Sequence, residues 1–465
     1  MQKRREDVCL KKRLAALVTV LVLAICLALP TAAVWQPPEQ AVNAEAVYLY
    51  QLDTDTLVFE KNAEQRRTPA SLTKLMTALL LVESGEDLSV EFTIPEQLTQ
   101  EFQHIRNENG SNADLKIGET VRLESLLYAC LLPSGNDAAS AIAYYLSNGD
   151  MPAFYERMNE RAAELGCSDT HFSCATGLDS MEQGTYSTAR DMFLIARACW
   201  QNETLMKVMC STEYWMPKTN IHTGMAKDAP EGTSYRVRST VSVQDPSSPL
   251  YREYIRGMKT GFTNEAGRCF VSAAKQDGSN WLLVVMGAPD GFAADGMTYA
   301  FHTAVDLYDW ALERFTPAAM ANTERPVLEL PLKWCSKTKT IGAYPADPTV
   351  ILTDRENPDD LIKTVKASVA EVETPVKAGQ VLGTLTVEVN GEAAAVTDLV
   401  AVRDYSRSGF LHMLDRLRPY RWAAVILGGA ILGLIGFWIN REVKKARVRK
   451  RRRKIRVAPP RKMKQ

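Results

Sequence analysis

The sequence predicts an α/β sandwich with an antiparallel sheet, followed by a small all-β domain and one transmembrane helix. Strand-like runs lie near both ends of the region before Pro317, with helical segments between them, so the chain should return to the same sheet. After Pro317 the pattern changes to short Val/Leu/Thr-rich runs broken by Pro and Gly. Near the C-terminus, Trp422 to Ile439 is eighteen residues without a charge, close to the length of a membrane-spanning helix.

The first strands are predicted as a hairpin. Two β-rich runs, 46–52 and 56–60, flank Asp53-Thr54-Asp55, and these three residue types favour a tight turn. The two runs should therefore pair with each other at the beginning of the sandwich.

A helix is predicted directly after the hairpin. Thr68 is suited to the N-cap, Pro69 to the first helical position and Gly85 to the C-terminal stop. The residues as far as Val82 are apolar on nearly all faces, so this helix should be buried.

The rest of the first domain continues with helices and closes with strands. A loop at 213–254 gives few structural signals, and Gln276-Asp277-Gly278-Ser279 is a hairpin turn. The predicted helices are 137–145, 153–165, 187–200 and 299–315, and the predicted late strands are 268–274 and 281–286. Strands of the small β domain are expected in the runs VLELPL, TVILT, KTVKASV and QVLGTLTVEV.

Charge is unevenly distributed, although 55 basic and 55 acidic residues give a formal net charge of zero. Residues 1–13 carry a net +4 and residues 441–465 a net +13, which leaves −17 for the body of the chain. An acidic body argues against nucleic acid as a partner. The apolar run Leu14 to Leu29, which follows basic residues and precedes Pro30-Thr31-Ala32-Ala33, is typical of a secretory signal. Because basic flanks stay in the cytoplasm, the body should be exported and held by the C-terminal helix.

No cofactor or metal site is expected. Nine cysteines occur, and the seven in the exported body show no regular spacing, so one or two disulfides are allowed and none is required. The histidines have no metal-binding spacing and are interpreted as surface or packing residues: His104, His171, His222, His302 and His412.

Three short motifs could carry chemistry. Ser71 and Lys74 share one face of the predicted helix, where an amine of lowered pKa can activate a serine hydroxyl. Alone this is weak, because the same spacing recurs at Ser336 and Lys339 in the β domain, and Ser71 could be a polar residue of the first helical turn. Ser134-Gly135-Asn136 could be a loop and helix cap, and Lys259-Thr260-Gly261 a surface turn. All three in this order are a specific signal of acyl-transfer chemistry.

With these motifs the chain resembles the low-molecular-weight penicillin-binding proteins, the D-alanyl-D-alanine carboxypeptidases. The resemblance includes PASLTKLMTALL at 69–80, LLPSGNDAA at 131–139, ATGLD at 175–179, YSTARDM at 186–192, GMKTGFTNEAG at 257–267 and PVKAGQVLGTLTV at 375–387. It implies the penicillin-binding-protein and serine β-lactamase fold. The expected organisation is a signal peptide at 1–33, a spacer at 34–44, a serine D,D-peptidase domain at 45–318, a β domain at 326–402, a linker at 403–421, a transmembrane helix at 422–440 and a cytoplasmic tail at 441–465.

The resemblance also implies roles for individual residues. Ser71 would be the acylated nucleophile, Lys74 its general base, and Ser134 a proton relay to the leaving amine. The implied substrate-binding residues are Asn136, which would also hold Lys74, together with Lys259, Thr260 and Gly261, and the oxyanion hole would be the backbone amides of Ser71 and Phe262. Lys259 would help to lower the pKa of Lys74.

The implied activity is removal of the terminal D-alanine from peptidoglycan pentapeptides through an acyl-enzyme, with β-lactams as covalent inhibitors. A β-lactamase-like hydrolase and a catalytically weak wall-binding protein remain alternatives. One departure concerns carboxylate binding: family members often have an Arg shortly after the strand that follows Lys-Thr-Gly, and here residues 287–297 contain none. Substrate preference, signal cleavage, oligomeric state and the role of the basic tail are left open by the sequence.

Overall fold

The computed structural model describes residues 35–455 except 179–181, 321, 357–360 and 390–391. The predicted signal peptide at 1–33 lies outside the described residues. The chain forms two compact units. The first comprises the residues up to Ala318 together with Val350–Leu361, and the second comprises Ala319–Thr349 and the residues from Ile362 onward.

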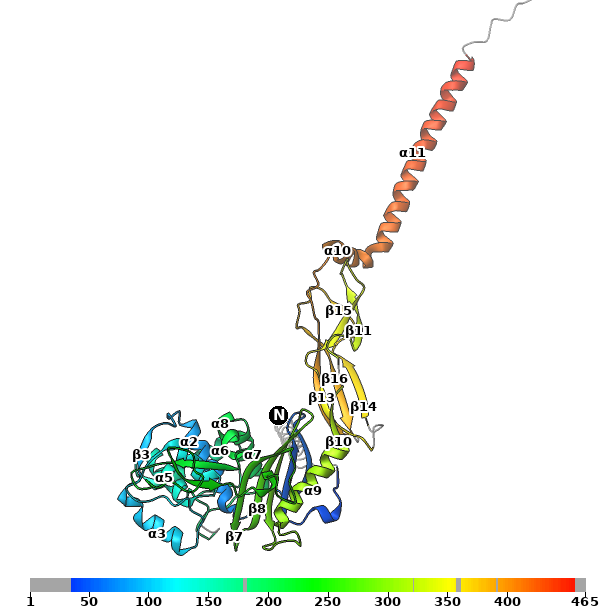
Figure 1. Ribbon diagram of the computed structural model, residues 1–465. Helices are drawn as coiled ribbons and strands as arrows, with labels where there is room; N and C mark the ends of the chain where they lie inside the picture. Colours follow the sequence, from blue (N-terminus) through cyan, green and yellow to red (C-terminus); the bar gives the residue numbers. More distant parts are fainter. Residues whose placement is uncertain (1–34, 179–181, 321, 357–360, 390–391, 456–465) are drawn as a thin grey trace, which may run out of the picture. The chain divides into compact units, whose positions relative to one another are not determined.

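An antiparallel sheet of five strands is the centre of the first unit (Figure 1). Its strands follow the order β2-β1-β9-β8-β7, so the last strands of the unit pair with the first ones, as the sequence predicted. Asp277 and Gly278, both with positive φ, form the tight turn between β8 and β9. The bounds of the strands are β1 Ala46–Gln51, β2 Thr56–Lys61, β7 Ile255–Thr263, β8 Gly267–Gln276 and β9 Ser279–Ala288.

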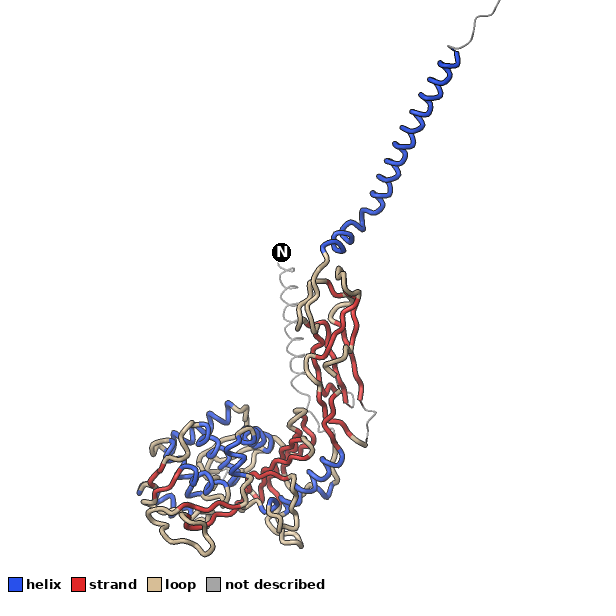
Figure 2. The backbone as a smooth tube through the Cα atoms, turned by 45° about the horizontal axis from the view of Figure 1, so that its top comes forward, coloured by secondary structure: helices blue, strands red, loops and turns tan. Residues whose placement is uncertain are grey.

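Helices cover both faces of this sheet (Figures 1 and 2). Tyr48 packs on Phe193 of helix α7 (Ala189–Trp200), with ring centroids 5.0 Å apart, and Phe270 packs on Phe301 of helix α9 (Tyr299–Arg314) at 4.9 Å. These contacts lie on opposite faces, because Tyr48 pairs with Val284 and Phe270 with Val285, which are neighbours along β9. Burial on both sides explains why β9 is apolar along almost its whole length. The first unit is therefore an α/β sandwich.

Helices α4 to α8 pack around α2. Helix α2 is buried from Lys74 to Leu81, as its all-round apolar sequence predicted. The helices are α2 Lys74–Glu83, α3 Thr99–Asn107, α4 Leu123–Leu131, α5 Asn136–Leu146, α6 Met151–Glu164, α7 Ala189–Trp200, α8 Glu203–Met209 and α9 Tyr299–Arg314. Two-stranded pairs and short 3-10 turns complete the unit: β3 Glu91–Thr93, β4 Thr120–Arg122, β5 Glu213–Pro217, β6 Thr233–Arg238, η1 Glu39–Ala41, η2 Ala70–Thr73, η3 Glu96–Leu98 and η4 Ser242–Gln244.

The start of the α2 region differs from the sequence prediction. A 3-10 turn, η2, precedes α2, and Ala70 at its beginning has a φ of 50°. Thr68 is not an N-cap, because its hydroxyl donates instead to Glu265 at 2.8 Å. Tertiary contacts therefore replace the local capping that the sequence suggested.

Trp35 shows that the predicted spacer is part of the folded unit. Its side chain is buried, and its ring lies 4.8 Å from that of Phe315. Ala41 and Ala44 are buried as well. Because burial of a large aromatic ring is favourable, this segment packs on the unit and does not behave as a free linker.

The second unit is a β domain built on a sheet with the order β14-β16-β17-β12-β11-β15. Its strands are β11 Leu328–Lys333, β12 Thr340–Pro345, β14 Leu361–Ala367, β15 Val372–Glu373, β16 Val381–Val389 and β17 Glu392–Val400. The expected strand TVILT does not join this sheet. It forms β13 Val350–Asp354, which pairs with β10 Phe315–Ala319, and Asp354 lies 2.8 Å from Arg314 at the end of α9. This ion pair and the strand pairing attach 350–354 to the first unit.

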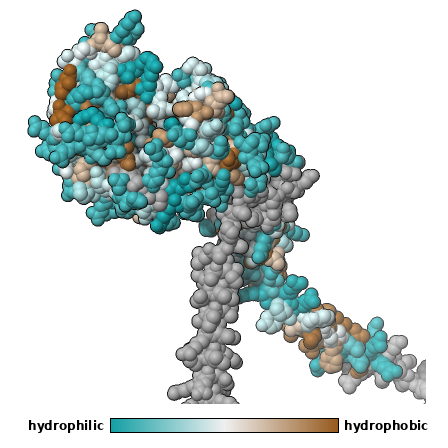
Figure 3. Space-filling view, turned by 90° about the horizontal axis from the view of Figure 1, so that it is seen from below, coloured by the Kyte–Doolittle hydropathy of each residue, from teal (hydrophilic) through white to brown (hydrophobic). Residues whose placement is uncertain are grey.

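The C-terminal part of the second unit is helical. It contains α10 Gly409–Leu417, η5 Arg418–Tyr420 and α11 Arg421–Ile455. The apolar part of α11 is fully exposed, and its mean hydropathy of 2.1 makes it a candidate to cross a membrane. By contrast, apolar residues form only small separate patches on the face of the first unit that Figure 3 shows.

Candidate active site

Ser71 and Lys74 meet at the junction between η2 and α2. The Nζ atom of Lys74 lies 2.9 Å from Oγ of Ser71 and 2.7 Å from the carbonyl oxygen of Thr176. Lys74 is completely buried, and burial lowers its pKa to about 8. An amine with this pKa is neutral in a fraction of molecules, roughly a tenth at pH 7, and the neutral form can accept the proton of a neighbouring hydroxyl.

A tight contact behind the serine fixes this turn. Gly177 has a φ of 79°, and a Cβ atom at this position would lie 1.9 Å from the carbonyl oxygen of Ala70. Only glycine allows the 174–178 loop to approach η2 so closely while Thr176 reaches Lys74. The sequence contained this glycine in the segment ATGLD, but nothing in it indicated the contact.

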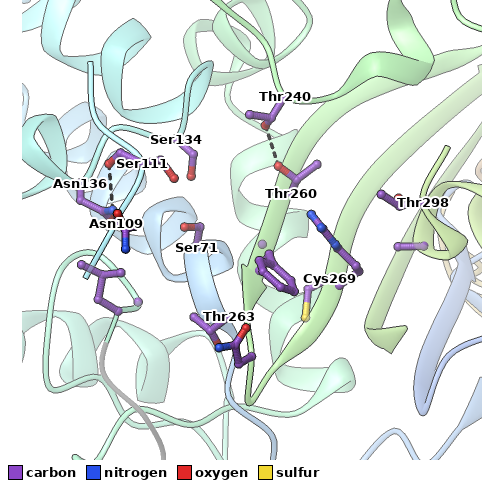
Figure 4. A pocket seen from close by; sticks show the side chains of 18 of the residues that line it. Ser71, Asn109, Ser111, Ser134, Asn136, Thr240, Thr260, Thr263, Cys269 and Thr298 are labelled. Carbon is purple, nitrogen blue, oxygen red and sulfur yellow. Dashed lines mark hydrogen bonds between the residues drawn. The ribbon is translucent and has the colours of Figure 1, made fainter. Parts of the chain in front are cut away.

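The Ser-Gly-Asn motif lies on the facing helical wall of the cleft. Ser134 has a φ of 63°, and its Oγ atom accepts a hydrogen bond from Nζ of Lys259 at 2.8 Å. Nδ2 of Asn136 donates to the carbonyl oxygen of Ser111 at 2.9 Å, whereas its buried Oδ1 has no partner among the described residues. Asn136 does not hold Lys74 as expected, since Oδ1, the amide atom that could accept a hydrogen bond from the Lys74 amine, has no partner among the described residues. Figure 4 shows Ser71 lying between this wall and β7.

The Lys-Thr-Gly motif lies on β7, on the opposite side of the cleft (Figure 4). Lys259 is completely buried, and burial together with the charge of Lys74 lowers its pKa well below the usual lysine value. We expected Lys259 to lower the pKa of Lys74, but burial of Lys74 itself is the main cause. The hydroxyl of Thr260 lies 2.6 Å from that of Thr240. Thr240 and Ser111 are site residues that the sequence motifs did not indicate.

Gly261 allows β7 to pass close to the η2 turn that carries Ser71. A Cβ atom on this residue would lie 3.1 Å from the carbonyl oxygen of Pro69 and 3.3 Å from the backbone nitrogen of Ser71. The strand therefore passes directly beside the nucleophile. The residue that follows, Phe262, lines the same cavity.

The cavity between the walls has a volume of about 870 Å³ and contains Ser71, Ser134, Asn136, Thr260 and Gly261 on its lining. Such a cleft accommodates a peptide end. The second Ser-x-x-Lys match does not form a comparable site. Ser336 and Lys339 are exposed on the loop between β11 and β12. Among the histidines, His104 is exposed, as expected of a surface residue, and it also lies on the lining of the cavity.

Other expectations concern cysteines and metals. The seven cysteines of the described residues are all free thiols. Within the same part of the chain, no three His, Cys, Asp or Glu side chains come together as a metal site.

A serine beside a buried lysine in such a cleft is the arrangement expected of an enzyme that forms a serine acyl-enzyme. The family model for D-alanyl-D-alanine carboxypeptidases matches residues 31–290, and a second model, for the C-terminal domain of penicillin-binding protein 5, matches residues 329–407. The chain therefore belongs to the D-alanyl-D-alanine carboxypeptidase family, and it is a serine-type D-Ala-D-Ala carboxypeptidase of cell-wall metabolism that binds penicillin.

Relatives support the assignment over most of the chain. D-alanyl-D-alanine carboxypeptidase DacF of Bacillus subtilis is 27% identical over 379 residues, which are 81% of this chain and 90% of the relative. The enzyme of Streptomyces sp. strain K15 is 32% identical over 285 residues, 59% of this chain and 91% of the relative.

Solved structures share the fold. Penicillin binding protein 5 from Haemophilus influenzae aligns with a TM-score of 0.61 at 22% identity, covering 80% of this chain and all of that protein. The Streptomyces K15 DD-transpeptidase aligns with a TM-score of 0.51 at 27% identity over 60% of this chain and all of that protein.

Proposed function

We propose that this chain removes the terminal D-alanine of peptidoglycan pentapeptides with Ser71 as nucleophile and Lys74 as general base. The observation that carries the proposal is the 2.9 Å approach of Nζ of Lys74 to Oγ of Ser71, combined with the lowered pKa of that amine, about 8. An ordinary lysine, with a pKa of about 10.4, would be almost fully protonated at neutral pH and could not accept a proton.

The first step forms the acyl-enzyme. Neutral Lys74 takes the hydroxyl proton of Ser71 while Oγ bonds to the carbonyl carbon of the penultimate D-alanine. The negative charge that develops on the carbonyl oxygen is stabilised by the backbone amides of Ser71 and Phe262. The close passage of β7 beside Ser71 at Gly261 supports this pairing of donors.

The second step expels D-alanine. The peptide C–N bond breaks, and the proton held by Lys74 reaches the leaving nitrogen through the Ser134 hydroxyl. Contact with Nζ of Lys259 at 2.8 Å orients this hydroxyl. The unpartnered Oδ1 of Asn136 is suited to accept a substrate amide N–H, and Thr260 to bind the terminal carboxylate.

Water then attacks the ester on Ser71 and releases the shortened peptide. The Streptomyces K15 relative is described as a DD-transpeptidase, so an amine is a second conceivable acceptor. Release of D-alanine in the presence and absence of an added D-amino acid distinguishes hydrolysis from transfer. A slow loss of the penicilloyl group distinguishes both from a β-lactamase, which must hydrolyse it rapidly.

We also propose that the catalytic unit lies outside the cytoplasmic membrane, with the apolar part of α11, 422–440, spanning the bilayer and the basic tail from 441 inside. The length and hydropathy of α11 support the span, and the +13 tail supports the orientation. Peptidoglycan stems are then accessible to the cleft.

The test is covalent labelling by benzylpenicillin, followed by intact mass. The wild-type chain should gain one penicilloyl group, Ser71→Ala should gain none, and Ser336→Ala should label normally as the matched control. An adduct on the Ser71→Ala variant would show that the nucleophile is elsewhere.

A further inference from the structure

The carboxylate end of the substrate lacks an obvious cationic partner. Residues 287–297 contain no Arg, and Lys259 is engaged with Ser134 and the carbonyl oxygen of Thr260. Both contacts and the burial of Lys259 leave its Nζ atom directed at protein partners, and burial also lowers its pKa from the usual lysine value. A carboxylate that must be recognised in this cleft needs a cation from another element.

Arg268 on β8 supplies a cation to the cleft. Among the described residues that line the cavity, it is the only Lys or Arg. It is paired in register with Phe262, two residues along β7 from Thr260, so both side chains lie on the same face of the sheet at the cleft. A guanidinium keeps its charge at every physiological pH.

Two aromatic rings hold the guanidinium in this position. Its central carbon lies 4.0 Å from the ring centroid of Phe262 and 5.4 Å from that of Phe292, and both phenylalanines line the cavity. Stacking of this kind orients the plane of the group while leaving its edge available for a bidentate anion contact.

Asp290 is the present partner of Arg268. A single carboxylate oxygen, Oδ1, lies 3.1 Å from Nε and 3.0 Å from Nη2. The side chain of Asp290 is 57% exposed, and exposed ion pairs contribute little to stability. Nη1 makes no hydrogen bond within the described part of the chain. The guanidinium can therefore donate to a second carboxylate while it binds Asp290, or release Asp290 and bind the other carboxylate in its place.

We propose that Arg268 binds the terminal carboxylate of the substrate in place of the Arg missing from 287–297, and that Asp290 competes with that carboxylate for the guanidinium. This inference rests on the proposed function, because it assigns a specificity residue to the same reaction. It makes Arg268 the reason that a free C-terminus is preferred over a blocked one.

The test compares two substrates that differ only in charge. One is a tripeptide that ends in D-Ala-D-Ala, and the other is the same peptide with a C-terminal amide. For each, kcat/KM for release of the last residue is measured at low ionic strength. The ratio of the acid value to the amide value reports carboxylate recognition.

Arg268→Gln should lower the acid-to-amide ratio about tenfold or more, mainly through KM for the acid, and Arg268→Lys should retain part of it. Asp290→Asn should raise the ratio severalfold, because the competing carboxylate is gone. Arg236→Gln is the matched control, since Arg236 also pairs with a carboxylate, that of Glu213, and stacks on an aromatic ring, that of Trp215, but does not line the cavity.

The acid-to-amide ratio should change in opposite directions in Arg268→Gln and Asp290→Asn, and this distinguishes carboxylate recognition from a structural role. If Arg268 and Asp290 only held the loop after β9, both variants would lose activity on the acid and the amide alike, and the inference would be overturned. A wild-type ratio retained by Arg268→Gln would also overturn it. Failure of the wild-type chain to release D-alanine at all would instead contradict the proposed function.

Discussion

At the residue scale, two buried lysines determine the chemistry of the cleft. Lys74 and Lys259 are completely buried, which is rare for lysine and costs stability. Burial lowers the pKa of both. The same desolvation that destabilises the charged amine makes Lys74 able to act as a base, so function and stability are in conflict at this position.

We expect the acylation rate to follow the neutral fraction of Lys74. Because the pKa is about 8, the rate constant for acylation by benzylpenicillin should rise with pH through that value and then level off. Lys74→Arg should lower the rate about 100- to 10,000-fold, since arginine stays protonated. Stopped-flow acylation between pH 6 and 10 checks both, and a flat profile or an active Arg variant would assign the base to another group.

The stability of the fold should depend on the same residue. The pKa of Lys74 is lower in the folded state than in the unfolded chain, so its cost is fully present below pH 8 and disappears as the pH rises through the unfolded value of about 10.4. Lys74→Met should therefore raise the free energy of unfolding by about 1–3 kcal/mol at pH 7, with a smaller gain at pH 10. Urea denaturation at the two pH values measures the free energy of unfolding of both proteins. If Lys74→Met gained no more stability at pH 7 than at pH 10, or lost stability at pH 7, burial of the charged lysine would not be costly.

At the element scale, the 3-10 turn η2 depends on contacts from distant parts of the chain. Gly177 lies against Ala70, Gly261 lies against Ser71, and Thr68 donates to Glu265. None of these contacts is local.

Gly177→Ala should therefore misplace Ser71. The added Cβ would lie 1.9 Å from the carbonyl oxygen of Ala70, and the φ of 79° is unfavourable for alanine. We expect destabilisation of about 3 kcal/mol or more and loss of acylation by about 100-fold. Gly85→Ala is the control, because it has a φ of 75° but no atom within 4 Å of the new Cβ. It should cost about 1 kcal/mol and acylate normally; equal effects of the two variants on acylation would show that the contact with Ala70 is unimportant.

The sequence predicted those elements whose conformation is set by their own residues, and it missed those that depend on contacts with distant parts of the chain. The β8–β9 hairpin was predictable because Asp277 and Gly278 adopt the positive φ values that their turn requires. The 3-10 turn was not predictable, because Ala70, with its φ of 50°, packs against the loop at Gly177, which is more than a hundred residues later in the sequence. Arg268 was missed for a similar reason, since its position beside Phe262 depends on the β7–β8 register.

At the scale of the whole molecule, the chain combines a catalytic unit with a β domain and a candidate membrane helix. Short apolar patches on the visible face of the first unit contrast with the fully exposed apolar surface of α11 (Figure 3). An exposed apolar surface of that length is stable in a bilayer and unstable in water. The helix is therefore consistent with membrane association, and the asymmetry of charge supports the proposed orientation.

Truncation should release the catalytic unit from the membrane. The chain should end before Gly409, because α10 also exposes apolar side chains, among them Phe410 and Met413. After signal cleavage, this shortened chain should be recovered in the soluble fraction and should still be acylated by penicillin. In cells without a wall, external protease should digest the body of the full chain and spare a C-terminal epitope. Digestion of the epitope would reverse the proposed orientation.

The most direct measurement of the central claim is release of D-alanine from a D-Ala-D-Ala peptide by the soluble body of the chain. The wild type should release one D-alanine for each peptide shortened, Ser71→Ala should release none, and both should show the same folded spectrum by circular dichroism. Release that persists undiminished in Ser71→Ala, or a folded wild type that releases no D-alanine, would contradict the account.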